Sequence, residues 1–77
     1  MAIKFERRTV QIEELEDCWM VNPPGGLHDT ASEALEWVKR RDQMAADAGA
    51  DRITTIEWIP KSRAGRAIVA VLTDGAA

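Results

Sequence analysis

Cysteine is nearly absent from this sequence, and its scarcity excludes two common ways of stabilising a small domain. Cys18 is the only cysteine among the 77 residues. The chain therefore cannot form an internal disulfide, and a zinc site built on paired cysteines is excluded. Because a lone cysteine is typical of a reducing compartment, we expect a cytoplasmic protein.

Histidine is equally scarce, which limits the chemistry available to the chain. His28 is the only histidine, and neither Cys18 nor Asp29 stands at the paired spacing of a metal site. Nucleophilic catalysis needs a base close to a cysteine or serine, and His28 is separated from Cys18 by a proline-rich loop. We interpret His28 as a solvated loop residue and Cys18 as half-buried. The sequence predicts no enzyme activity, no metal and no cofactor.

A phosphate-binding loop is also missing. Gly25 and Gly26 precede a predicted helix, and glycines in that position can let backbone amides surround an anion. Asp29, however, lies where the anion would bind, and the lysine of a P-loop is absent. We interpret the segment as an ordinary turn.

Long apolar runs and an excess of basic residues are lacking as well. No stretch reaches the roughly 18 consecutive apolar residues of a membrane helix, and no apolar core of a signal peptide follows the bases of Met1 to Arg8. Thirteen acidic residues outnumber ten basic residues, giving a net charge of -3. We therefore expect no membrane insertion and no export, and direct nucleic-acid binding is disfavoured.

The clearest local structure is a helix predicted from Thr30 to Ala48. Thr30 and Glu33 have the spacing of a capping box, in which the threonine hydroxyl accepts from the glutamate amide. Gly49 supplies the left-handed residue that often follows the last turn. Apolar residues at three- and four-residue spacing predict one inward face: Ala31, Ala34, Leu35, Val38, Ala45 and Ala48.

Four other segments have the composition of strands. Ile3 to Ile12 changes its apolar parity at Arg7-Arg8, which predicts a bulge there. Cys18 to Val21 is a short apolar run, and we expect these two segments to pair as a hairpin. Arg52 to Ile59 is rich in Ile, Thr and Trp, and Ala67 to Thr73 is apolar at both parities, as in a buried strand.

This order of segments predicts one α+β domain over residues 1–77. The expected sheet has four strands, mainly antiparallel and in the order β-β-α-β-β, with one helix packed on one face. One helix leaves the other face open, and we expect Val69, Val71 and one parity of the strand Arg52 to Ile59 to contribute to that face. That parity is either Arg52, Thr54, Ile56 and Trp58 or Ile53, Thr55, Glu57 and Ile59. We include Trp58, Val69 and Val71 among the predicted partner-binding residues. A chain this short buries only about 60% of its unfolded surface. We therefore expect a protein partner or a homodimer to cover the open face.

An acidic run offers a second contact surface. Four of its five residues are acids: Glu13, Glu14, Glu16 and Asp17. One interpretation is a docking site for a basic partner, and the alternative is a solvated turn anchored by Leu15. We include the four acids among the predicted partner-binding residues.

A basic segment over residues 61–66 carries Lys61, Arg63 and Arg66. These bases could contact nucleic acid, but no aromatic residue is interleaved with them. Solubility and turn formation are the alternative reasons for their presence.

In size, acidity, single cysteine and compact α+β pattern, the whole chain resembles the small accessory proteins of phages and prophages, among them the anti-CRISPR proteins. The resemblance implies a stoichiometric inhibitor that occupies a surface of a host nucleic-acid-handling complex, in the host cytoplasm. It transfers no functional residue. The alternative functions are a small homodimeric structural or assembly protein, and a nucleic-acid-binding regulator that uses residues 61–66.

Overall fold

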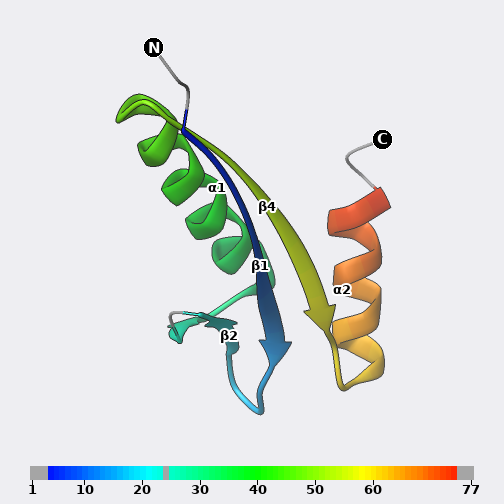
Figure 1. Cartoon of the computed structure of the whole chain (residues 1–77). Coiled ribbons are helices and arrows are strands. Elements are labelled where there is room, and N and C mark those ends of the chain that lie inside the picture. Colours follow the sequence, from blue (N-terminus) through cyan, green and yellow to red (C-terminus); the bar gives the residue numbers. More distant parts are fainter. Residues whose placement is uncertain (1–3, 24, 75–77) are drawn as a thin grey trace.

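The computed structural model describes residues 4–23 and 25–74, which form one sheet and two helices (Figure 1). Along the chain the elements are β1 (Lys4–Glu14), β2 (Trp19–Asn22), β3 (Gly26–His28), α1 (Ala31–Asp47), β4 (Ala50–Ile59) and α2 (Arg63–Asp74).

The sheet is mixed, with the strand order β3-β2-β1-β4. Strand β1 pairs antiparallel with β2, as the predicted hairpin requires, and parallel with β4. Helix α1 makes the crossover that two parallel strands need. The α+β class with four strands is confirmed. Two of the three strand pairings are antiparallel, as predicted. The order β-β-α-β-β with a single helix is wrong, because the sequence prediction lacks β3 and its last strand is a helix.

The segment Ala67 to Thr73 lies within α2. An apolar run at both parities fits a buried strand, but it also fits a helix whose apolar residues recur every three or four positions. Gly65, Val69 and Leu72 have that spacing, and all three are buried or half-buried. The β-branched residues favoured the strand interpretation, whereas packing against the core selected the helix.

Strand β1 runs without the predicted bulge. Its register with β4 is unbroken from Lys4↔Ala50 to Glu13↔Ile59. Alternation therefore continues through the arginine pair, so that Val10 and Ile12 face the core while Phe5, at 51% exposure, points to the opposite face. Ile3, on which the prediction of a bulge partly depended, lies outside the described residues.

Strand β3 was predicted as part of a loop. It is three residues long and, within the described part of the chain, pairs with β2 alone, matching Met20 to Leu27 and Trp19 to His28. A short edge strand that contains glycine has almost no sequence signal of its own.

Helix α1 confirms the predicted ends. The Glu33 amide donates to Thr30 Oγ1 at 3.1 Å, and Gly49 has a φ of 90°. Ala31, Ala34 and Val38 are buried, which confirms the first half of the predicted inward face. The predicted face is too long, since Ala48 at its end is exposed.

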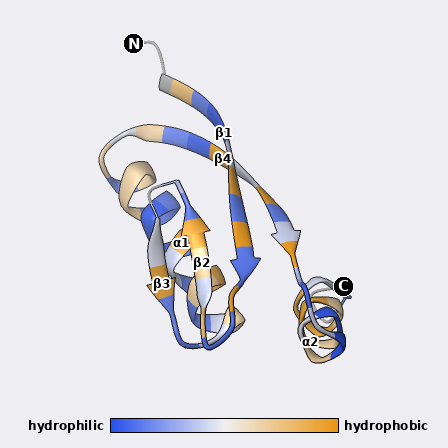
Figure 2. Cartoon of the chain, turned by 90° about the horizontal axis from the view of Figure 1, so that it is seen from below, coloured by the Kyte–Doolittle hydropathy of each residue, from blue (hydrophilic) through white to orange (hydrophobic). Residues whose placement is uncertain are grey.

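The core lies between the sheet and the helices. Its buried residues come from β1, β2 and α1: Val10, Ile12, Trp19, Val21, Ala31, Ala34 and Val38. Half-buried residues of β4 and α2 pack against the same cluster: Ile56, Trp58, Val69 and Leu72. Figure 2 shows the alternation of hydrophobic and hydrophilic residues along β1 and β4, so only one face of the sheet belongs to the core.

Candidate protein-binding surfaces

The end of β1 is joined to the start of α2 through the carboxylate of Glu14. Glu14 Oε1 accepts from the backbone amides of Lys61 at 2.7 Å and Ser62 at 2.8 Å. The Ser62 hydroxyl donates to Glu14 Oε2 at 2.6 Å and accepts from the Gly65 amide at 2.9 Å. Ser62 therefore caps α2, and Glu14 supplies the negative charge that the N-terminal end of a helix favours.

This arrangement lowers the pKa of Glu14. The Ser62 hydroxyl is the main cause, followed by the Ser62 and Lys61 amides and the positive charge of Arg66. The carboxylate also explains the glycine at position 65, because a Cβ there would collide with Glu14. The acidic run thus contributes an anchor to the fold, a function that its sequence alone did not indicate.

The other predicted acids differ from Glu14 and from one another. Glu13 pairs with Lys61 at 2.6 Å, so the acidic run and the basic segment, predicted as separate surfaces, meet each other. Glu16 and Asp17 are exposed in the turn between β1 and β2. The structure therefore leaves only these two carboxylates of the four fully accessible to a partner.

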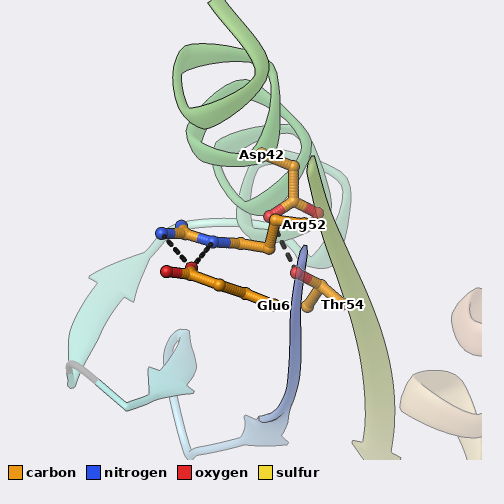
Figure 3. A network of polar contacts seen from close by, with 4 residues as sticks. All are labelled: Glu6, Asp42, Arg52 and Thr54. Carbon is orange, nitrogen blue, oxygen red and sulfur yellow. Dashed lines mark hydrogen bonds and ion pairs between the residues drawn. The ribbon is translucent and has the colours of Figure 1, made fainter. Parts of the chain in front are cut away.

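A second polar cluster ties the far end of the sheet to α1 (Figure 3). Arg52 of β4 pairs with Glu6 of β1 at 3.2 Å, and the Thr54 hydroxyl donates to Asp42 of α1 at 2.7 Å. In this cluster the arginine lies beside the glutamate, and the threonine hydroxyl lies beside the aspartate. These contacts connect β4 to both β1 and α1, which indicates a structural role for the cluster.

His28 is placed differently from the prediction of a solvated loop residue. It lies half-buried in β3, with its ring 5.7 Å from that of Trp37. Cys18 is half-buried, as expected, in the turn before β2. Within residues 4–23 and 25–74, no cluster of three His, Cys, Asp or Glu side chains could hold a metal ion.

The face of the sheet opposite the core is open. Three large apolar side chains are exposed on it: Phe5 at 51%, Leu27 at 62% and Ile53 at 49%. Met20 and Ile59 are half-buried and have the same parity in the paired strands. A shallow depression on this face is lined by Arg7, Arg8, Thr9, Ile53 and Thr55.

The apolar residues predicted to bind a partner on this face lie elsewhere. Trp58 points into the core, where its ring packs edge-to-face on Trp19 with centroids 6.3 Å apart. Val69 is half-buried against the core from α2, and Val71 is 70% exposed on α2. Of the two parities of β4 that the sequence left open, the one with Ile53 is on the open face and the one with Trp58 faces the core. Val69 and Val71 lie on a helix and not on a strand of the sheet. The alternation of β1, with Phe5 opposed to Val10 and Ile12, was the signal that could have located the open face.

Comparison with protein-family models, with curated proteins and with solved structures found no match. Among the helices of the described residues, neither is long and apolar enough to cross a membrane.

Proposed function

We propose that the chain is a non-enzymatic protein-binding module whose contact surface is the open face of the sheet. The observation that carries this proposal is the exposure of Phe5 and Ile53, which lie on the paired strands β1 and β4, with Leu27 exposed farther along the same face of the sheet. Exposed apolar residues are common singly, but several on one face are typical of an interaction site.

The polar residues of this face indicate the chemistry that a partner surface would need. Arg7 lies beside Ile53 in the paired strands, and its guanidinium is 5.6 Å from the centre of the Phe5 ring. A guanidinium held over an aromatic ring still has donors for a carboxylate. The face therefore suits a protein that presents an apolar side chain with an acidic neighbour.

Capture from a bacterial lysate, with quantitative mass spectrometry, tests this proposal. Ile53→Glu places a charge beside Phe5 and Arg7 on the open face and should remove the captured protein. Met44→Glu is the matched control, because Met44 is also exposed, at 61%, but lies on α1. Equal loss with both variants, or no loss with Ile53→Glu, would overturn the proposal.

The identity of the captured protein tests the narrower hypothesis of a phage-type inhibitor. That hypothesis predicts a component of a host nucleic-acid-handling complex, whose activity falls when the chain is added. Capture of a protein without such a role would support the proposal of a protein-binding module but would exclude a phage-type inhibitor of such a complex.

The basic segment gives less support to a nucleic-acid-binding regulator. Lys61 is paired with Glu13, and Arg66 acts on the carboxylate of Glu14. These acids reduce the positive potential that contacts with phosphate would need. Arg63, the remaining base of the segment, is exposed.

A further inference from the structure

Strand β1 has one edge that its neighbours cover only in part. Strand β2 pairs with residues 11–14 of β1, and β4 pairs along the opposite edge. Beside residues 5–10, no strand of the described chain lies on the side of β2. Figures 1 and 2 both show β1 extending past β2. On this side, which we call the free edge of β1, backbone amides and carbonyls are open to another strand.

Arginines flank the free edge on both faces of the sheet. Arg7 is exposed on the open face, whereas Arg8 is half-buried on the face that carries α1. Arg41 of α1 is exposed and lines a narrow cleft together with Arg8. Its guanidinium lies 5.2 Å from the centre of the Trp37 ring, and the other neighbour of that ring is His28 of β3. Arg41 therefore lies on the side of α1 that faces β3 and the free edge.

These three arginines have no carboxylate partner among the described residues. Two acids on the same strand and helix are engaged elsewhere, since Glu6 pairs with Arg52 and Asp42 accepts from the Thr54 hydroxyl. An unpaired guanidinium has several donors for a carboxylate. A strand placed on the free edge would therefore meet positive charge on both of its faces.

We propose that the free edge of β1 binds an extended acidic segment of the protein partner, which joins the sheet as a strand beside residues 5–10. The inference rests on the proposed function and specifies the part of the partner that is bound. Successive side chains of a strand point to opposite faces. Two consecutive acids can therefore reach Arg7 on the open face and Arg8 with Arg41 on the other.

A second copy of this chain does not supply such a segment. Two free edges paired with each other would bring like charges together, because each carries Arg7 and Arg8. The outer edge of β4 carries Asp51 and Glu57, but both have the parity of the open face and cannot meet arginines on opposite faces. Pairing β1 of one copy with β4 of another would also continue into an open filament. The surface therefore suits a segment of a different protein.

A synthetic peptide tests strand addition directly. The probe carries two central glutamates between valine and threonine residues, and calorimetric titration measures its binding. Binding should slow amide hydrogen exchange at alternate positions of residues 5–10, where the amides point away from β4. A peptide of equal charge that is N-methylated at alternate residues cannot pair along its backbone and should not bind. A peptide with two lysines in place of the glutamates should not bind either.

Variants of the chain test the charges. Arg7→Gln and Arg8→Gln should each weaken binding of the glutamate peptide by about two- to fivefold. Arg40→Gln is the matched control, because Arg40 is exposed on α1 and pairs with Glu36, and it should leave binding unchanged. Circular dichroism establishes that each variant is folded.

Three results would overturn the inference: no binding of the glutamate peptide, equal binding of the N-methylated peptide, or equal effects of Arg7→Gln and Arg40→Gln. Tighter binding of a single-stranded RNA oligonucleotide than of the glutamate peptide would also overturn it, because the arginines would then serve phosphates. Failure here differs from failure of the proposed function. A protein that is still captured, and lost with Ile53→Glu, would keep the open face as the contact and remove only the added strand.

Discussion

The two helices differ in where the information that forms them lies. Helix α1 has its start and end marked by neighbouring residues, with the Thr30 hydroxyl at one end and Gly49 at the other. Helix α2 starts at Arg63 and is capped by Ser62, whose hydroxyl donates to Glu14, a residue 48 positions earlier. Local signals therefore make α1 readable from sequence, while α2 depends on a contact that only the fold creates.

The two helices also differ in how much of them is buried. Three residues of α1 are buried, whereas Gly65, which has no side chain, is the buried residue of α2. The contribution of α2 to the core comes from half-buried Val69 and Leu72. We therefore expect α1 to be integral to the stability of the domain, and α2 to be attached more weakly.

The same substitution in both helices provides the largest expected difference. Val38→Ala removes a side chain that is 4% exposed and should lower the free energy of unfolding by about 2 kcal/mol. Val69→Ala in α2 should cost about 1 kcal/mol, because half-buried methyl groups lose less contact. Urea titration measures both. Equal costs would show that α2 is packed as firmly as α1.

The two helix caps provide the next comparison. Thr30→Ala should cost about 1 kcal/mol, because the Glu33 amide loses its acceptor. Ser62→Ala should lie nearer the upper end of the range of about 0.5–2 kcal/mol for such changes, since this hydroxyl both accepts from Gly65 and donates to Glu14. Thermal unfolding of the two variants under one condition decides the order. A smaller cost at Ser62 would mean that Glu14 alone suffices to start α2.

The pH dependence of stability should identify Glu14. Its pKa is lowered in the folded chain, so its contribution is present above the pKa of an unfolded glutamate, about 4.3. That contribution is lost as the pH falls through the lower folded pKa. Unfolding free energies measured from neutral pH to about pH 3 should therefore fall less steeply below about pH 4.3 in Glu14→Gln than in the original chain. Parallel curves would show that the carboxylate is not held at α2.

The smallest effect is expected at the exposed part of the acidic run. Changing Glu16 and Asp17 together to Gln and Asn should alter stability by no more than about 0.5 kcal/mol, because both are exposed in a turn. Guanidinium or urea titration beside Glu14→Gln separates the acid that anchors α2 from those that do not. A large loss would show that the turn itself depends on these charges.

Much of the fold was predictable wherever a segment carries its own pattern. The limits of α1 and the β1–β2 pairing follow from caps and alternation. The open sheet face was expected because only one helix was predicted, whereas the second helix, α2, packs against the same core. The parallel β1–β4 pairing was not predictable in the same way, because no residue in either strand specifies the direction of its neighbour. Amino-acid composition and the alternation of apolar residues likewise could not decide between strand and helix for Ala67 to Thr73.

The candidate surfaces were likewise predictable only where a segment carries its own pattern. Exposure on the open face follows from alternation, and Phe5 could have been assigned to it from β1 alone. Trp58 was assigned to the wrong face, because parity in β4 is fixed only by its register with β1. The contact between Glu14 and Lys61 joins the acidic run to the basic segment. It could not be predicted, because these chain positions are far apart in sequence and meet only in the fold.

The pairing of β1 with β4 also constrains the order in which the chain can fold. Partners such as Glu6 and Arg52 are 46 positions apart, and contacts over such separations form later than hairpins and helices. During synthesis, β1 and β2 can pair while the opposite edge of β1 still lacks its neighbour. An unpaired edge is a site for association between nascent chains. The charges Arg7 and Arg8 in the middle of β1 oppose such association until β4 has been made.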